Sequence, residues 1–325
     1  MRAWRVERPG EPSEVLSLAD VPVPEPGPGQ IRVQVTAAGI GLPDVLMCRH
    51  TYPLTPSGAF TPGQEGAGVV IAVGPDVDMA LGTKVMSTTS FMEGSGSFAE
   101  EYLTPARSSF AVPSGLGDVE AAGFWIPHLT AWIGLVDRAH LEPGQWVAVI
   151  GAAGGSGIAA VQLGRALGAR VVAIVSDEAR AEFCRGRGAD ETINYRDGDL
   201  AGRLRLITGG RGVDVVYDPV GGSVAEEAAT ALARHGRLLA VGFASGNWAR
   251  IETINLVVTN TSLVGVYAGD YGRDELDVIH ARLSDLVSSG RLQNTVTTQV
   301  AFDDLPSALQ RLADRSVIGK MVMVC

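Results

Sequence analysis

Hydrophobic and polar residues alternate in two different rhythms along this chain. Up to about residue 120, short apolar runs are separated by Pro- and Gly-rich turns. The strict alternation of residues 31–36 predicts a strand with one buried face, and a second strand is predicted at 66–74. The first region is therefore expected to be a small, irregular β domain.

From about residue 120 the pattern changes to apolar strands that alternate with helical segments. Runs of Val, Ile and Leu predict buried parallel strands at 146–150, 170–175, 213–217, 237–242 and 262–267. Helices are predicted between them at 157–168, 177–187, 198–207 and 223–234. Alternating strands and helices predict a doubly wound α/β sheet with right-handed crossovers.

After residue 270 the pattern predicts one more helix, strand, helix and strand, at 274–289, 294–300, 303–313 and 320–324. The final apolar run is expected to return to the first domain, so that the parallel-sheet domain is inserted within it. The expected boundaries are 1–120 and 271–325 for the β domain and 121–270 for the inserted domain.

Composition and charge narrow the possible functions. The chain has 325 residues, enough for two cores, and its net charge of −10 argues against nucleic acid or an anionic membrane as partner. No apolar run approaches the ~20 residues that a membrane-spanning helix requires, and no signal peptide is evident. Three widely spaced cysteines favour a reducing cytoplasm.

The strongest chemical signal follows the predicted strand at 146–150. The chain there reads Gly-Ala-Ala-Gly-Gly-Ser-Gly over residues 151–157 and enters a helix of small residues. Such a turn lets backbone N–H groups at a helix N-terminus approach a dinucleotide pyrophosphate. The predicted phosphate-binding residues are Gly154, Gly155, Ser156 and Gly157. Glycines in such a turn also allow close helix–strand packing, which is the alternative reading.

The end of the next predicted strand indicates which dinucleotide binds. The strand ends in Ser176, and Arg180 and Tyr195 follow; hydroxyl, guanidinium and phenol groups all suit a phosphate dianion. Asp177 opposes this interpretation, because a carboxylate here holds a ribose 2′-hydroxyl and repels a 2′-phosphate. We expect NADPH as the cofactor.

Short motifs occur in a specific order along nearly the whole chain, among them Ala37-Ala38-Gly39-Ile40, Pro62-Gly63-Gln64-Glu65-Gly66, Leu129-Thr130-Ala131-Trp132 and Asp218-Pro219-Val220-Gly221-Gly222. Their order and spacing resemble the zinc-independent quinone oxidoreductase (ζ-crystallin-like) branch of the medium-chain dehydrogenase/reductase superfamily. The resemblance implies a Rossmann sheet inserted in a GroES-like irregular β-barrel catalytic domain. It also implies NADPH-dependent hydride transfer to a quinone or an α,β-unsaturated carbonyl.

The resemblance implies roles for further residues around the cofactor. Thr130 is similar to a threonine near the nicotinamide, with an ordinary helix-lining hydroxyl as the alternative. The segment beside the nicotinamide ring comprises Gly242, Phe243, Ala244 and Ser245, although Phe243 is equally compatible with core packing. The cofactor channel is expected to include Leu42, Pro43, Val220, Val266 and Tyr267. Arg315 is a weaker candidate, for which a surface charge is the alternative.

Two residues are implied on the substrate side. Tyr52 resembles a tyrosine at the mouth of the quinone site, where its phenol would hydrogen-bond the acceptor oxygen or donate a proton. A packed loop aromatic is the alternative. Asp44 either helps to organise the catalytic cleft or caps a helix that starts near Val45.

The resemblance also locates the positions at which zinc-dependent relatives carry metal ligands. These positions hold Gly41, Gln64 and Ile126, which offer at most one poor donor, so no metal is expected. Without a Lewis acid, the acceptor must already be electrophilic, as quinones and enones are.

Two alternatives stay open, and one assembly is predicted. An enoyl-thioester reductase would use the same hydride chemistry, and a non-catalytic NADPH-binding structural or sensor protein would keep the same nucleotide site. Residues 261–267 would form an exposed apolar edge strand in a monomer. We therefore expect a homodimer in which this strand pairs with its symmetry mate.

Overall fold

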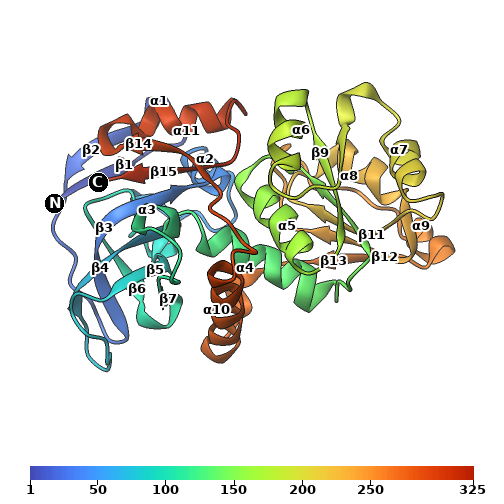
Figure 1. Ribbon diagram of the computed structural model, residues 1–325. Coiled ribbons are helices and arrows are strands. Elements are labelled where there is room, and N and C mark those ends of the chain that lie inside the picture. Colours follow the sequence, from blue (N-terminus) through green and yellow to red (C-terminus); the bar gives the residue numbers. More distant parts are fainter. The chain divides into compact units, whose positions relative to one another are not determined.

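Two structural units are built from one chain in the computed structural model, which describes residues 1–325 (Figure 1). One unit, the first unit, comprises Met1–Ile126 and Asn294–Cys325, and the inserted unit comprises Pro127–Gln293. The boundaries differ from the expected ones, because the first unit continues to residue 126 and resumes at 294 rather than at 271.

Two hydrogen bonds hold the segment 271–293 in the inserted unit. The Tyr271 hydroxyl bonds the Asp137 carboxyl, and the backbone N–H of Gln293 donates to Gln162 Oε1 at 2.8 Å. The helical pattern of this segment does not reveal these partners, which lie more than a hundred residues earlier in the chain.

A six-stranded parallel sheet forms the centre of the inserted unit, with the order β10-β9-β8-β11-β12-β13. Its strands are β8 (Trp146–Ile150), β9 (Arg170–Val175), β10 (Glu191–Asn194), β11 (Val213–Asp218), β12 (Leu232–Ala240) and β13 (Ser262–Gly265). The strand order reverses at β8, which is the topological switch point of a doubly wound sheet. The predicted α/β architecture is confirmed, and β13 lies at an edge as expected.

Helices cover both faces of this sheet (Figure 1). The helices that follow β8 along the chain are α5 (Gly155–Ala166), α6 (Glu178–Arg185), α7 (Leu200–Ile207), α8 (Gly222–Ala229), α9 (Thr253–Thr259) and α10 (Arg273–Ser288). Alternate strand residues join the core with α7 and α8 on one face. On the other face α5 approaches closely, since a Cβ on Gly164 would lie 3.1 Å from Val147 Cγ1. Helix α4 (Trp125–Trp132) and a π-helical turn (Ile133–Arg138) precede β8.

Two strands of this sheet differ from the predicted pattern. The pattern does not predict β10, because only Ile193 of this short strand is fully buried. Strand β12 starts at Leu232, inside the predicted helix 223–234. Here pairing of Leu232 with Val213, and the left-handed backbone of His235 (φ 67°), override a helix-compatible sequence.

The first unit is built around a mainly antiparallel sheet of order β14-β15-β3-β4-β5-β7, with β6 paired to β3. Its strands are β3 (Gln30–Ile40), β4 (Glu65–Val73), β5 (Lys84–Thr88), β6 (Glu101–Pro105), β7 (Ser109–Ala111), β14 (Val296–Ala301) and β15 (Lys320–Val324). A separate pair is formed by β1 (Arg2–Val6) and β2 (Leu16–Asp20). Its helices are α1 (Pro12–Val15), α2 (Leu42–Cys48), α3 (Asp118–Ala121) and α11 (Leu305–Ala313), and its short 3₁₀ turns are Phe91–Glu93, Ala106–Ser108 and Phe302–Asp304. The inserted unit has two such turns, Tyr195–Asp197 and Ala268–Asp270.

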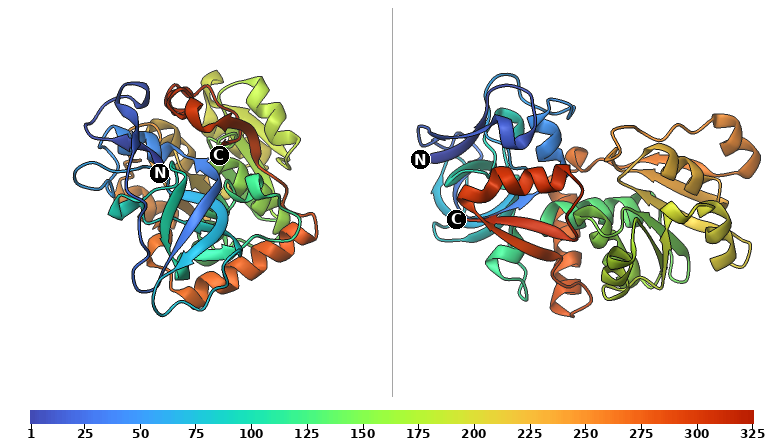
Figure 2. Two further views of the ribbon diagram at one scale, coloured as in Figure 1. Left: turned by 90° about the vertical axis from the view of Figure 1, so that its left-hand side faces the viewer. Right: turned by 90° about the horizontal axis from the view of Figure 1, so that it is seen from above.

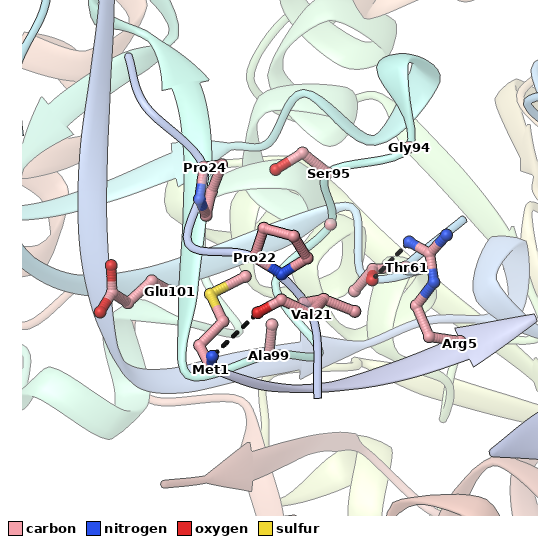
Figure 3. Close-up of a pocket in the computed structure, with 11 residues that line it drawn as sticks. Met1, Arg5, Val21, Pro22, Pro24, Thr61, Gly94, Ser95, Ala99 and Glu101 are labelled. Carbon is pink, nitrogen blue, oxygen red and sulfur yellow. Dashed lines mark hydrogen bonds between the residues drawn. The ribbon is translucent and has the colours of Figure 1, made fainter. Parts of the chain in front are cut away.

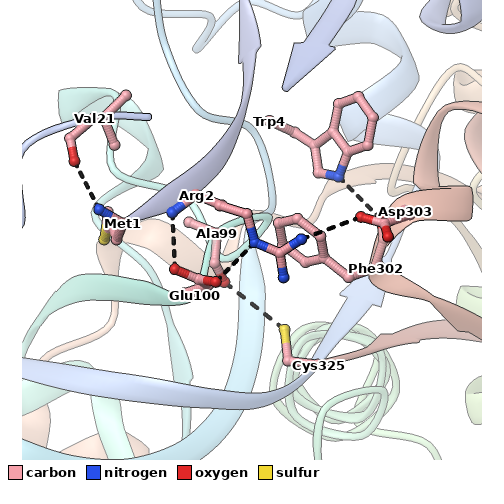
Figure 4. A network of polar contacts seen from close by, with 9 residues as sticks. All are labelled: Met1, Arg2, Trp4, Val21, Ala99, Glu100, Phe302, Asp303 and Cys325. Carbon is pink, nitrogen blue, oxygen red and sulfur yellow. Dashed lines mark hydrogen bonds and ion pairs between the residues drawn. The ribbon is translucent and has the colours of Figure 1, made fainter. Parts of the chain in front are cut away.

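The C-terminal segment completes the first unit, so both termini lie in it (Figure 2). Strand β15 pairs antiparallel with β3, in register Met321 to Ile40. The indole N–H of Trp4 donates to the carbonyl of Phe302 at 3.0 Å, and Arg2 pairs with Asp303 (Figure 4). These contacts explain why the last apolar run returns to the starting domain. None of the helices combines the length and the apolar character that crossing a membrane requires.

Candidate functional site

The carboxyl ends of the six parallel strands gather most of the predicted site residues of the inserted unit. Parallel strands end at the same edge of a sheet, and ligands bind there in doubly wound folds. The residues that follow these strands are Gly154–Gly157 after β8, Ser176 and Arg180 after β9, Tyr195 after β10, Val220 after β11, Gly242–Ser245 after β12, and Val266 and Tyr267 after β13. The site residues predicted for this unit are therefore brought together, for the most part, at the carboxyl edge of the parallel sheet.

The glycine-rich loop leaves backbone donors unpaired at the start of α5. Gly154 N–H donates to the carbonyl of Gly151 at 3.0 Å, and Ile158 N–H donates to that of Gly154 at 2.8 Å. The N–H groups of residues 155–157 have no acceptor in the protein, and no side chain caps the helix. Three unpaired N–H donors at a helix N-terminus are an arrangement that can bind an anion.

Gly157 shows that close packing is also required in this loop. A Cβ at this position would lie 2.3 Å from the carbonyl oxygen of Gly151, so any larger residue would push α5 away from the loop. The two readings of the loop are thus compatible, because the packing is what brings the donors together.

Ser176 and Arg180 already share an anionic partner. Asp177 caps α6, its Oδ1 accepting the N–H of Arg180 at 3.0 Å, while Oδ2 accepts the Ser176 hydroxyl at 3.0 Å and pairs with the Arg180 guanidinium. The backbone hydrogen bond from Arg180, with these side-chain partners, lowers the pKa of Asp177. Asp177 therefore occupies the two groups that were predicted to bind a 2′-phosphate.

The register of β10 determines where Tyr195 lies. Asn194 pairs with Val175, so Tyr195 leaves its strand opposite the point where Ser176 leaves β9. The backbone thus brings a phenol-bearing residue next to the Ser176 segment.

Two loops at the same edge are bonded to each other. The buried Asp218 accepts the N–H groups of Val220 and Gly221 at 2.9 and 2.7 Å, and Ser245 N–H donates to the carbonyl of Val220 at 2.8 Å. The Phe243 ring packs on Trp248, with 4.8 Å between the ring centroids. Thr130 lies on α4, half-buried. These contacts fix the loops that the family resemblance assigns to the nicotinamide side.

In the first unit, α2 begins at Leu42 and Pro43, and Asp44 stands at its third position, from which the carboxylate reaches the N–H of the N-cap residue. Asp44 Oδ2 accepts the N–H of Gly41 at 2.8 Å, and Oδ1 accepts that of Gly63 at 3.1 Å. Burial raises the pKa of this carboxyl to about 7. Both oxygens are engaged by backbone donors, an arrangement that favours the capping role among the two alternatives for Asp44.

A buried ion pair that sequence reasoning missed lies beside Gly41. Lys320 Nζ is 2.5 Å from Glu65 Oε1, and Glu65 Oε2 accepts the N–H of Ile126 at 3.0 Å. A Cβ on Gly41 would lie 4.0 Å from Lys320 Nζ. The signal for this pair was a lone Lys in the last apolar run, where an unpaired charge would be costly.

Gln64, at one of the three positions where zinc-dependent relatives are expected to carry metal ligands, contacts a neighbouring side chain. Gln64 is buried, and its amide nitrogen lies 3.6 Å from the Met47 sulfur. Nowhere in the chain do three or more His, Cys, Asp or Glu side chains come together as possible metal ligands.

The remaining predicted residues of the first unit are Tyr52 and Arg315. Tyr52 is half-buried and packs on the core cluster of this unit, and its backbone carbonyl accepts the hydroxyl of Thr55 at 2.7 Å. Arg315 follows α11 with a left-handed backbone (φ 57°).

A surface cavity of about 270 Å³ also lies in the first unit (Figure 3). Its lining includes Met1, Arg5, Pro22, Ser95 and Glu101. None of the predicted site residues contributes to it, so the cavity is separate from the candidate site.

Comparisons with known proteins identify both parts of the chain. Residues 27–114 match the alcohol dehydrogenase GroES-like domain, and residues 155–285 match the zinc-binding dehydrogenase family. The quinone oxidoreductase-like protein 2 homolog of Nematostella vectensis is 32% identical over 295 residues, which cover 89% of this chain and 80% of that protein. The chain belongs to the quinone oxidoreductase branch of the medium-chain dehydrogenase/reductase superfamily.

Two further members of the superfamily extend the comparison. The crystal structure of Escherichia coli quinone oxidoreductase complexed with NADPH has a TM-score of 0.90 at 27% identity, with complete coverage of both chains. A 2-haloacrylate reductase from Burkholderia is 34% identical over 272 residues, covering 81% of this chain and 80% of that protein. The predicted family and fold are confirmed, and the chain is assigned to a family of oxidoreductases.

Proposed function

We propose that this protein uses NADPH to reduce a quinone or an α,β-unsaturated carbonyl compound, without a metal ion. The observation that carries the proposal is the set of unpaired N–H donors at residues 155–157, together with Ser176 at the end of the adjacent strand and Arg180 in the helix that follows it. The NADPH complex of the E. coli relative supports the same cofactor here.

The residues present fit a dinucleotide. The backbone donors at the start of α5 would hold the pyrophosphate, and Ser176, Arg180 and Tyr195 would hold the 2′-phosphate. When bound, the reduced cofactor supplies a hydride. Thr130, Val220 and the segment Gly242–Ser245 would orient the nicotinamide end, and Leu42, Pro43, Val266, Tyr267 and Arg315 are further proposed contacts.

NADPH is favoured because Arg180 can exchange its partner. The Asp177–Arg180 pair is partly exposed to water, so it is weak, whereas a phosphate dianion offers more charge and more acceptor oxygens. Ser176 would exchange partners in the same way.

The proposed acceptors need no metal to become reactive. Gly41 and Ile126 have no ligand atom, and the Gln64 amide is a poor donor to zinc. Quinones and conjugated carbonyls stabilise the anion that hydride addition creates. We propose that the Tyr52 phenol hydrogen-bonds the acceptor oxygen and that Asp44 positions the start of α2.

We also propose a homodimer built on β13. Leu263 and Tyr267 are 44% and 58% exposed, and Val257 and Val258 on α9 are 70% and 68% exposed. Pairing of β13 with its symmetry mate would extend the sheet and cover its free edge.

The function is tested by following NADPH oxidation in parallel with benzoquinone, phenanthrenequinone and crotonyl-CoA. Turnover with a quinone, without turnover of the thioester, supports the proposal. Turnover of crotonyl-CoA alone would identify an enoyl-thioester reductase. Tight NADPH binding without oxidation by any acceptor would identify a binding protein rather than an enzyme.

A further inference from the structure

A buried tyrosine, Tyr217, forms a hydrogen bond with a residue of the glycine-rich segment 151–157. Tyr217 lies near the end of β11 and is fully buried. It pairs with Val149 of β8, the strand that leads into the loop. Its hydroxyl oxygen is 2.9 Å from Ser156 Oγ, and this is the only hydrogen bond of the phenol.

Burial decides the direction of this hydrogen bond. A phenol carries one proton, and a buried O–H without an acceptor costs about 1–3 kcal/mol. Tyr217 therefore donates and Ser156 accepts, because the reverse would leave the phenol proton unpaired. Burial also raises the pKa of Tyr217, so the phenol keeps the proton that it donates.

The consequence is a free donor on Ser156. Its oxygen accepts from Tyr217, so its own proton is directed elsewhere, and no other protein group accepts it. Ser156 is half-buried and stands in the first turn of α5, among the N–H groups that have no acceptor.

The position of the phenol ring is itself fixed. A Cβ on Gly134, in the π-helical turn, would lie 3.2 Å from Tyr217 Cε2, so the ring packs directly on this glycine. With the strand on one side and Gly134 on the other, the ring has little freedom to turn the hydroxyl away from Ser156.

We propose that Tyr217 is a positioning residue, which holds the Ser156 hydroxyl so that its proton points toward a bound phosphate. The site would then offer one side-chain donor in addition to its backbone donors. This inference rests on the proposed function in one respect, namely that the anion is the pyrophosphate of NADPH.

The test is a double-mutant cycle with Tyr217→Phe and Ser156→Ala, read as the Kd for NADPH by fluorescence titration. Each single variant is expected to raise Kd about 3- to 10-fold, the effect of one net hydrogen bond. The double variant is expected to equal Ser156→Ala alone, because Tyr217 acts through Ser156. In Tyr217→Phe the loss should appear in KM for NADPH rather than in kcat, since the phenol contacts no reacting atom.

Tyr102→Phe is the matched control. Tyr102 is also fully buried and its hydroxyl is 2.7 Å from Ser87 Oγ, but this pair lies in the first unit, away from the loop. It should lose similar stability in a thermal melt with no change in Kd. Ser156→Thr, which keeps the hydroxyl, should bind NADPH within about 2-fold of the wild type.

The outcomes separate the two proposals. A wild type that binds no NADPH overturns the proposed function. If the wild type binds, two results overturn the positioning role alone. One is a Tyr217→Phe variant with the Kd of the wild type. The other is a double variant whose increase in Kd is the product of the two single increases.

Discussion

The exchange of partners at Arg180 predicts how the choice between NADPH and NADH can be changed. In the free protein the guanidinium pairs with Asp177, and the two side chains are 22% and 37% exposed. A pair of this exposure contributes about 0–1 kcal/mol. A charge-assisted hydrogen bond to phosphate contributes about 1.5–3 kcal/mol. For values near the middle of these ranges the difference is about 1–2 kcal/mol, which corresponds to a roughly 5- to 30-fold preference for NADPH.

Arg180→Ala should therefore lower kcat/KM for NADPH by about 5- to 30-fold and change the value for NADH by less than about 2-fold. Asp177→Asn should act in the opposite direction. It removes the competing carboxylate and its repulsion of the phosphate, and we expect kcat/KM for NADPH to rise by about 3- to 5-fold. Asn caps helices as well as Asp does, so α6 should stay intact.

Arg185→Ala is the control for a loss of positive charge on the same helix. Arg185 pairs with Glu178 and Glu182 on α6 rather than with Asp177. It should leave both cofactors unaffected in steady-state assays with one fixed quinone. Equal losses for NADPH and NADH in Arg180→Ala would refute the reasoning, because Arg180 would then serve the helix and not the 2′-phosphate.

Three further predictions concern stability, pH and assembly. Lys320→Met leaves Glu65 as an unpaired buried charge and should lower the free energy of unfolding by about 3–5 kcal/mol in urea titrations, whereas a loss below about 1 kcal/mol would mean that Glu65 is solvated. The folded pKa of Asp44, about 7, exceeds the unfolded value, so its contribution to stability is complete at low pH and is lost as pH rises through about 4 to 7. Asp44→Asn should remove this part of the pH dependence in urea titrations, and an unchanged pH profile would contradict the burial argument. Leu263→Lys should convert a dimer into a monomer in light scattering, and a wild type that is monomeric at micromolar concentration would exclude the β13 interface.

The sequence predicted the structure best where a local pattern of residues determines the type of element that forms. Strands rich in Val and Ile that alternate with helices are parallel, and parallel strands end at the same edge of their sheet, so the edge that gathers Ser156, Ser176 and Val220 followed from the pattern. The helix N-terminus at Gly154 followed from its glycines in the same way. Tyr195 was also predicted, but the pairing of β10 with β9, which brings Tyr195 next to the Ser176 segment, is seen only in the structure.

Contacts between distant segments could not be predicted in this way. The Glu65–Lys320 pair joins β4 to the last strand, and the bond between Tyr217 and Ser156 joins β11 to the first turn of α5, sixty-one residues apart in the sequence. Helix α9 escaped prediction because its sequence, Thr-Ile-Asn-Leu-Val-Val-Thr, is dominated by β-branched residues, which favour strands. Such features depend on contacts with residues distant in the sequence, and the periodicity of hydrophobic residues gives no information about these contacts.

The most direct test of the whole account is the rate of NADPH oxidation by a quinone after the protein has been depleted of metal with a chelator and its metal content measured. The account predicts full activity with no stoichiometric zinc. Activity that disappears on chelation and returns only with added Zn²⁺ would contradict it.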